Sequence, residues 1–302
     1  MLDFVPVTPD MYEEASECLK KAGRRACEYS FANNYAWREL YGTHICIYKG
    51  FYIFMTRTPV FSFPAGDVSD RDTLAEIIGL MREYAAANDM PFVIYNATEE
   101  DILLLKELFG GEFTYSPDED SFDYIYEASA LAQLRGKKYH SKRNHLAKIE
   151  NYSYEYSALK SSDFDDCMAL AARLYRENGT ESRSLAAEQT AIQTFFECFD
   201  RFSLSGGILR IDKKAAAFTI GERILPDTLD IHIEKADTAF DGTYAAINSF
   251  YAQQAVSGYE GLVYINREED MGIEGLRKAK RSYHPAFMLK KHAAVFGKDM
   301  LL

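Results

Sequence analysis

The chain is short of the residues that disulfide frameworks, zinc sites and membrane spans require. It has five cysteines, an odd number, and they are scattered along the chain. No two of them form a C-x-x-C pair, and no histidine lies at ligand spacing from them. We therefore expect inert thiols, no disulfide framework and no bound metal. No segment approaches the roughly 18 uncharged apolar residues of a membrane helix, and the first residues lack the basic and apolar regions of a secretion signal. We expect a cytoplasmic protein with no membrane span.

Nothing in the composition suggests disorder or a fibrous protein. The 302 residues are 47% hydrophobic and 26% charged, with 21 tyrosines and 20 phenylalanines. This apolar content is ordinary for a soluble globular chain and supplies a core without disulfide support. The length corresponds to two domains of ordinary size or to one large domain.

Positive charge is scarce and is concentrated in two segments. The net charge of −12 argues weakly against a general nucleic-acid binder. Residues 135–148 and 277–291 each contain six lysine or arginine side chains and no acid, and the rest of the chain has 22 basic against 46 acidic residues. An acidic body with two basic islands is expected to attract a polyanion to one place. Two solvated helix faces would explain the same runs, and both interpretations stay open.

A unit of predicted structure recurs about 170 residues further along the chain. In each copy, helices precede a strand hairpin, and a helix, a strand and a second helix follow. The recurring parts include the hairpins at 44–57 and 207–223, the helices at 72–87 and 243–256, and the strands at 91–96 and 261–266. Antiparallel strands followed by a crossover, twice, predict an α/β protein with mixed sheets and two tandem domains. We place the domains at residues 1–130 and 151–302, joined by a basic bridging helix at 131–150.

One predicted strand carries three ionisable side chains in a row on one face. Residues 228–234 alternate strictly, so Asp230, His232 and Glu234 share a face opposite three apolar residues. A central strand of a mixed sheet is expected to be apolar on both faces. The three groups therefore indicate a cleft in which Glu234 or His232 serves as a general base. An edge strand with this face in solvent is the alternative.

Polar residues also follow the next buried strand. Asn266 ends this strand, and ligands of α/β sheets collect at the carboxyl ends of strands beside helix N-termini. The acids at 268–270 are explained by capping of the helix that follows and by its dipole. Trp37 and the tyrosines near it are interpreted as packing residues of a helix at 31–41.

The order of elements in the second half is also that of the Gcn5-related N-acetyltransferase (GNAT) fold, in which an acyl donor lies across two splayed parallel strands. Four motifs sharpen the similarity. They are FANNYAWR at 31–38, KKYHSKRNHL at 137–146, HIEKA at 232–236 and YINREEDMGIEGLRKAK at 264–280. Together they closely resemble the family named after the C-terminal domain of phosphatidylglycerol lysyltransferase, over nearly the whole chain.

This resemblance implies two tandem GNAT-like acyl-CoA N-acyltransferase domains, related to the Fem-type enzymes that move amino acids from aminoacyl-tRNA to cell-wall precursors. It implies transfer of an acyl or aminoacyl group to an amine or hydroxyl of a small-molecule or peptide acceptor, with tRNA as partner and no required cofactor. No membrane domain precedes the motifs, so transfer to a lipid is not expected. The loop at 240–246 has Asp241 and Tyr244 where acyl-CoA users hold a pyrophosphate with a basic residue and a glycine.

The strand pattern and the resemblance together define three groups of candidate site residues. The candidates for catalysis, with the tyrosine as general acid, are Glu234, His232 and Tyr283. The candidates for substrate binding are Asp230, Asn266, Arg267, Glu269 and Tyr264. The candidates for binding a polyanionic donor are Lys138, Lys142, Arg143, His145, Arg277, Lys278 and Lys280.

Two other functions stay open. An acyl-CoA-dependent N-acetyltransferase would bind acetyl-CoA and have no affinity for RNA. A non-catalytic protein would have kept the fold and lost the donor site, and would bind a small anionic ligand or a partner protein. Residues 59–67 of the first domain contain no donor loop, which favours a supporting role for that domain.

Overall fold

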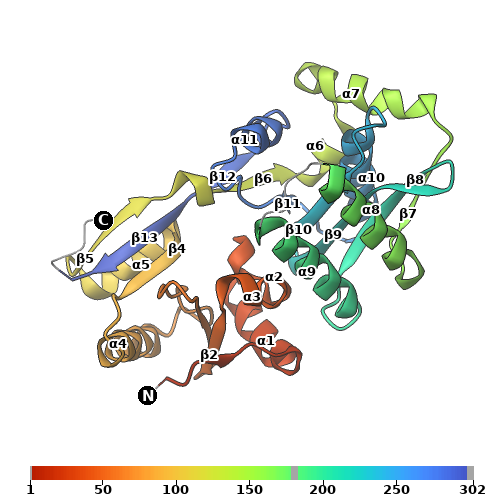
Figure 1. The fold of residues 1–302 in the computed structure, drawn as a ribbon. Helices are drawn as coiled ribbons and strands as arrows, with labels where there is room; N and C mark the ends of the chain where they lie inside the picture. The colour runs from red at the N-terminus through yellow and green to blue at the C-terminus, as the bar shows by residue number, and fades with distance from the viewer. Residues whose placement is uncertain (1, 178–182, 298–302) are drawn as a thin grey trace. The chain divides into compact units, whose positions relative to one another are not determined.

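The computed structural model describes residues 2–177 and 183–297 and divides the chain into two compact units (Figure 1). Unit 1 comprises the residues up to Asp123, the segment Glu269–Gly272 and the residues from Leu289 onward. Unit 2 comprises Tyr124–Glu268 and Ile273–Met288. After it first enters unit 2, the chain therefore returns to unit 1 twice.

Unit 1 combines two small sheets with helices from the first half of the chain. Its helices are α1 (Tyr12–Ala22), α2 (Phe31–Ala36), α3 (Arg38–Tyr41), α4 (Arg71–Ala87) and α5 (Glu99–Phe109). Its strands are β1 (Val5–Pro6), β2 (His44–Tyr48), β3 (Phe51–Met55), β4 (Val93–Thr98), β5 (Phe113–Pro117) and β13 (Lys291–Phe296). The strand orders are β1-β2-β3 and β4-β13-β5, and a single parallel bridge joins Phe61 to Ile94 of β4.

Short polar signals set the ends of these elements. Asp70 accepts a 3.0 Å hydrogen bond from the first turn of α4, and Thr98 with Asp101 forms a capping box at the start of α5. Lys49 and Gly50, with φ of 49° and 77°, supply the left-handed turn of the β2–β3 hairpin. The hairpin, helix and strand predicted in this region are thus confirmed.

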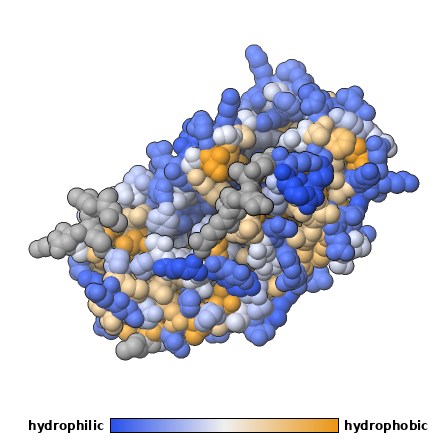
Figure 2. Space-filling view, in the orientation of Figure 1, coloured by the Kyte–Doolittle hydropathy of each residue, from blue (hydrophilic) through white to orange (hydrophobic). Residues whose placement is uncertain are grey.

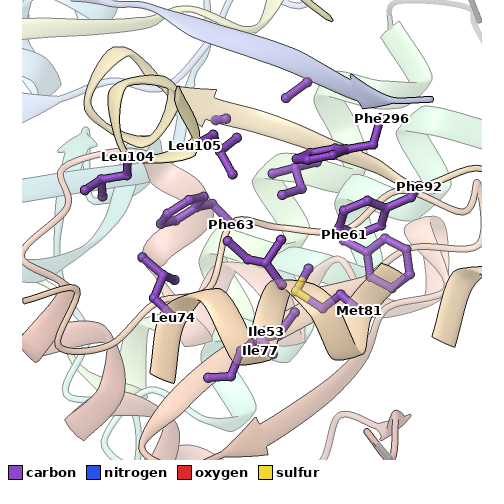
Figure 3. Packing of buried hydrophobic residues seen from close by; sticks show 14 of the residues in the cluster. Ile53, Phe61, Phe63, Leu74, Ile77, Met81, Phe92, Leu104, Leu105 and Phe296 are labelled. Atoms are coloured by element: carbon purple, nitrogen blue, oxygen red, sulfur yellow. The ribbon is translucent and has the colours of Figure 1, made fainter. Parts of the chain in front are cut away.

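The core of unit 1 gathers aromatic and aliphatic side chains from both sheets and from α4 and α5 (Figure 3). The ring centroids of Phe61 and Phe92 are 5.6 Å apart, and those of Phe92 and Phe296 are 4.9 Å apart. Met81 of α4 and Leu105 of α5 are fully buried against this cluster. Because Phe296 belongs to β13, the last strand of the chain completes a core built from the first half.

Unit 2 is organised around one sheet of seven strands, in the order β12-β6-β11-β10-β9-β8-β7. The strands are β6 (Asp123–Glu127), β7 (Tyr154–Ala158), β8 (Ser205–Ile211), β9 (Lys214–Leu225), β10 (Thr228–Ala236), β11 (Tyr264–Asn266) and β12 (Phe287–Leu289). The helices are α6 (Ala128–Gln133), α7 (His140–Ala147), α8 (Phe164–Glu177), α9 (Arg183–Glu197), α10 (Thr243–Gly258) and α11 (Glu274–Arg281). Helix α10 contacts α6 and strands β8, β9 and β10.

The parallel strands β10 and β11 separate after a short paired segment. Thr228–Asp230 of β10 lies opposite Tyr264–Asn266 of β11. Strand β10 then continues to Ala236, paired with β9 on its other side, whereas β11 ends. The register with β9 shifts at His232, which corresponds to a β-bulge and interrupts the strict alternation predicted for this strand. Among the described residues, no strand pairs with the second half of β10 on the side of β11, and we call this place the gap between β10 and β11.

The units differ from the predicted domains 1–130, 131–150 and 151–302. Strand β13 lies between β4 and β5, so the end of the chain belongs to unit 1. The basic segment is not one bridging helix, because a 3-10 turn at Lys137–Tyr139 precedes the eight residues of α7, and all of it lies in unit 2. Local sequence patterns predict that a segment forms a strand, but not which strand it pairs with, because the pairing partner can lie at any distance along the chain. The predicted domain bounds differ from the two units for this reason.

Across the residues that the structure describes, no helix combines the length and the apolarity needed to cross a bilayer. On the face shown in Figure 2, hydrophilic residues separate the apolar areas from one another. Both observations agree with the absence of long apolar runs in the sequence.

The packing of α5 predicts different costs for two leucines on the same helix. Leu105 has no exposed surface and Leu103 is 66% exposed. We expect Leu105→Ala to lower the free energy of unfolding by about 3 kcal/mol, because it leaves a cavity in the core of unit 1. Leu103→Ala, the matched control, should change it by less than about 0.5 kcal/mol. Urea denaturation checks both values, and equal effects would contradict the packing described here.

Candidate functional site

Two oppositely charged side chains meet in the gap between β10 and β11. Arg267, the first residue after β11, places Nη2 2.8 Å from Oε1 of Glu234 on β10. Asn248 of α10 donates a 3.2 Å hydrogen bond to Oε2 of the same carboxylate. The side chains of Arg267 and Glu234 are only 12% and 10% exposed. Burial acts to lower the pKa of Arg267, but the charge and hydrogen bond of Glu234, together with Tyr126 and Tyr283, raise it overall, so the guanidinium stays charged.

Aromatic rings and backbone contacts fix Arg267 in place. Its guanidinium carbon lies 5.0 Å from the ring centroid of Tyr283 and 5.7 Å from that of Tyr126. The Nζ atom of Lys280 donates to the backbone carbonyls of Arg267 and Glu268, at 2.5 and 3.2 Å. The end of β11 is therefore held rigidly beside β10.

Lys142 brings a second cation into this site from α7. Its Nζ atom lies 3.8 Å from the ring centroid of Tyr283. Burial and, to a smaller extent, the positive charge of Arg267 together lower the pKa of Lys142 to about 8, while Glu234 acts in the opposite direction. A lysine with this pKa exchanges a proton near neutral pH, which is the property of a general acid or base.

Tyr283 lies between the two cations. It is only 7% exposed, and burial raises its pKa to about 12, with Arg267 opposing and Glu234 supporting this shift. At neutral pH the phenol is therefore protonated. Its ring faces both Lys142 and Arg267, so the predicted site residue Tyr283 does lie beside Glu234 and Arg267.

His232 points away from this arrangement into a buried cluster of carboxylates. Its ring nitrogens lie 3.0 Å from Glu268, 3.4 Å from Glu222 and 3.8 Å from Asp230, and the ring stacks on Phe195 at 5.1 Å. Burial acts to lower the pKa of His232, but hydrogen bonds to Glu222 and Glu268 and the charge of Asp230 raise it to about 10. The imidazole is therefore protonated at neutral pH and cannot accept a proton.

The same cluster has the spacing of a metal site. Ligand atoms of Asp230, His232 and Glu268 lie within 4.8 Å of one another. A protonated imidazole has no free lone pair, so a metal would have to displace the proton that three carboxylates stabilise. The imidazolium supplies one positive charge against the three carboxyl groups.

The remaining candidates for substrate binding are dispersed. Asp230 and Asn266 have no exposed surface, and the Asn266 side chain accepts a 2.7 Å hydrogen bond from the backbone of Glu268. Tyr264 packs edge-on against Phe287, with centroids 5.5 Å apart. Glu269 belongs to unit 1. Of the five candidates, only Arg267 lies in the gap beside Glu234.

The two basic islands meet within unit 2. The ring of His284, just after α11, is 3.1 Å from the backbone carbonyl of Lys138, just before α7. Arg143 is bound to the carbonyls of Leu134 and Gly136. Lys280 is buried, Arg277 is half-buried, and the exposed members of the predicted donor-binding set are Lys138, His145 and Lys278. The set thus divides into residues that hold the fold and residues that face solvent.

Helix α7 and the turn after it cover the N-terminus of α10. Gly242 caps α10 with φ 91°, and a Cβ atom at this position would lie 2.4 Å from the backbone oxygen of His145. Lys148 forms a 3.2 Å ion pair with Asp241, whose backbone nitrogen donates to the hydroxyl of Tyr152. A helix N-terminus is a natural binding place for phosphate, but here part of the protein packs against it.

Sequence reasoning missed two parts of this site. Asn248 is one of several polar residues of α10 and is followed directly by the buried Ser249, so no local pattern singled it out. Lys142 was predicted to bind a polyanionic donor, and only the packing of α7 against Tyr283 reveals its partly buried position in this site.

The fold and the site define the class of protein. Two mixed α/β units, one with a parallel strand pair that separates beside a polar site, have the tandem GNAT-like fold of acyltransferases, shared with the Fem-type proteins. Residues 20–295 match the family described as "Phosphatidylglycerol lysyltransferase, C-terminal", and the chain belongs to this family. Family and fold point to an acyl or aminoacyl transferase.

Solved structures include one relative of clear sequence similarity. A conserved protein of unknown function from Bacteroides thetaiotaomicron VPI-5482 is 33% identical, with a TM-score of 0.90 over 98% of this chain and 100% of that chain. L-PGS from Bacillus licheniformis is 13% identical, with a TM-score of 0.67 over 96% and 93%. FemX is 9% identical, with a TM-score of 0.64 over 98% and 97%. The chain matches none of the curated proteins.

The environment of His232 predicts a pH-dependent contribution to stability. Because its pKa rises from 6.5 to about 10 on folding, the stabilisation is complete below about pH 6.5 and is lost as the pH rises through 10. We expect His232→Gln to lower the free energy of unfolding by about 3 kcal/mol at pH 6.5, because three carboxylates lose their cation. Urea denaturation should show a clearly smaller difference at pH 10.

The exposed His140 provides the control. His140→Gln should change the free energy of unfolding by less than about 0.5 kcal/mol at both pH values. If the effect of His232→Gln does not shrink with rising pH, the imidazole is not held in its charged form.

Proposed function

We propose that the chain transfers an aminoacyl group from an aminoacyl-tRNA to an amine or hydroxyl of a small-molecule or peptide acceptor. The observation that carries this proposal is the arrangement of Glu234, Arg267 and Lys142 in the gap between β10 and β11. A carboxylate, a fixed guanidinium and a lysine that titrates near pH 8 are the groups that acyl transfer from an ester requires.

The reaction needs one proton acceptor and one proton donor. The acceptor nitrogen or oxygen attacks the ester carbonyl carbon, and Glu234 takes its proton. Arg267 and Lys142 stabilise the negative charge that develops on the carbonyl oxygen. The bond between the acyl carbon and the ribose oxygen then breaks, and the ammonium of Lys142 protonates the leaving oxygen. Lys142 suits this step better than Tyr283, because its pKa of about 8 lies closer to neutral pH than about 12.

The covered N-terminus of α10 favours a tRNA donor over an acyl-CoA. A Cβ atom on Gly242 would lie 2.4 Å from the carbonyl oxygen of His145, and Asp241 places a negative charge beside the position of a pyrophosphate. The exposed Lys138, His145 and Lys278 offer sites for a phosphate backbone instead. An RNA donor needs no pyrophosphate pocket.

A substitution of Lys142 tests the proposed chemistry without disturbing the fold. We expect Lys142→Met to lower the rate of transfer from radiolabelled aminoacyl-tRNAs about 100-fold, because it removes the proton donor. The free energy of unfolding should stay equal or rise, because a desolvated cation beside Arg267 is lost. The wild-type rate should fall as the pH rises through about 8.

The matched control is Lys137→Met, which removes an exposed lysine beside the same helix and should leave the rate unchanged. Glu234→Gln should also abolish transfer, but it leaves Arg267 without its partner and therefore lowers stability as well. Full activity of Lys142→Met would refute this mechanism. Transfer from acetyl-CoA without any affinity for RNA would refute the proposed donor.

The exposed lysines predict a salt-dependent affinity for tRNA. The double variant Lys138→Ala, Lys278→Ala should weaken tRNA binding and lower the slope of log affinity against log salt concentration by about one per lost phosphate contact. Lys213→Ala, Lys214→Ala, which removes two exposed lysines from the β8–β9 turn, should leave the slope unchanged. Filter binding between low and high salt measures both, and equal slopes for the two variants would contradict the assigned surface.

A further inference from the structure

Unit 1 contains a cavity of about 700 Å³ that the transfer chemistry does not use. Trp37, Tyr41, Phe54 and Tyr95 contribute aromatic walls. Trp37 was expected to pack in a helix, but the helix breaks there, between α2 and α3, with φ −94° and ψ 6°. The volume is that of a pocket for a small organic molecule.

The polar lining of this cavity is acidic. Glu28, Asp118, Asp120 and Glu269 contribute four carboxyl groups, and among the described residues that line it none is basic. An apolar wall opposite carboxylates suits a ligand with one cationic end and a hydrocarbon or aromatic body.

The floor is a buried network around one lysine. The Nζ atom of Lys291 on β13 lies 2.7 Å from Glu28, 2.7 Å from Asp123 and 4.0 Å from Glu269. Its side chain has no exposed surface. Three carboxyl groups therefore surround a single ammonium, and the network has a deficit of positive charge.

Two residues of the floor hold oxygens that lack a donor. Within the described residues, Glu28 Oε2 and Asn96 Oδ1 are buried and have no hydrogen-bond partner, although Asn96 Nδ2 donates a 2.6 Å bond to Glu28 Oε1. Asn96 adopts φ 55°, a left-handed conformation that is uncommon outside glycine. Burial raises the pKa of Glu28 to about 8, against the effect of Lys291 and with support from the charges of Asp123 and Glu269. At neutral pH this carboxyl is therefore mostly protonated, and a second cation beside it would favour its ionised form.

A metal ion suits this floor less well than an amine. Ligand atoms of Cys27, Glu28 and Glu269 lie within 4.8 Å of one another, but the Lys291 ammonium already lies against them, 3.4 Å from the sulfur and 2.7 Å from Glu28. Burial raises the pKa of the Cys27 thiol well above its usual value, so it stays neutral and is a poor metal ligand.

We propose that the cavity of unit 1 binds a primary amine, with the ammonium near Glu28 and Asn96 and the apolar body against Trp37 and Phe54. The ammonium supplies the hydrogen-bond donors and the positive charge that the floor lacks. The proposal rests on residues of unit 1 alone and does not depend on the transfer reaction.

The single tryptophan of the chain makes the test direct. Trp37 is the only tryptophan in the sequence and lines the cavity, so its fluorescence reports on occupancy. We expect 2-phenylethylamine to produce a saturable change in emission and a matching heat of binding by calorimetry. The uncharged analogue 2-phenylethanol should bind at least about tenfold more weakly, because it cannot pair with the carboxylates.

Variants separate the site from a general effect of charge. Asn96→Gly fits the φ of 55° without strain and removes the amide oxygen, so it should fold and lower the amine affinity about tenfold. Glu28→Gln should lower it further, with folding checked by thermal unfolding because Lys291 loses one partner. Asp89→Asn, which removes an exposed acid elsewhere in unit 1, should leave the affinity unchanged.

Three results would overturn the proposal. Equal affinity for the amine and the alcohol would show that the cavity recognises only apolar bulk. Saturable binding of Zn²⁺ without any response to the amine would assign the floor to a metal. The absence of both a fluorescence change and a heat of binding for the amine at about 10 mM would exclude an amine site of useful affinity.

Discussion

The ion pair between Arg267 and Glu234 spans the gap that opens where strands β10 and β11 part. Separation of two strands inside a sheet exposes an unpaired edge and requires polar groups at a buried position, which is costly unless each group has a partner. Arg267 meets this need with its side chain, at 2.8 Å from Glu234, and with its carbonyl, which accepts from Lys280. The gap keeps its shape because breaking this pair would leave a buried charge alone.

Burial of cations explains why several ionisable residues differ from their expected roles. From the sequence, His232 was predicted to be a general base and Lys280 a ligand of a polyanionic donor. His232 instead lies among three carboxyl groups, and Lys280 binds two backbone carbonyls. Because the chain is acidic, each of these buried cations lies near several hydrogen-bond acceptors. Its contacts with them give it a structural role. Lys142 is different, because burial and, second to it, the charge of Arg267 lower its pKa to about 8.

Sequence reasoning predicted the parts of the fold that depend on local patterns. The hairpins, the helices α4 and α10 and the strand that carries Glu234 follow from alternation, helical periodicity and turn residues. The alternation placed Glu234 and His232 on one face of the strand. The register shift at His232 instead directs the His232 side chain into a separate buried cluster of carboxyl groups. The position of β13 between β4 and β5 depends on pairing between distant segments, which no local pattern encodes.

The internal repeat places an asparagine at the same position of two strands, and the charges beside the two asparagines differ. Asn96 and Asn266 occupy corresponding places in the two copies of the buried strand. Each strand has a parallel contact, which is a single bridge at Ile94 in the first copy and the three paired residues Tyr264–Asn266 in the second. The residue after Asn266 is an arginine, and the one after Asn96 is Ala97. The second copy therefore carries a fixed positive charge directly after Asn266, whereas the cavity beside Asn96 is lined by carboxyl groups and, among the described residues, by no cation.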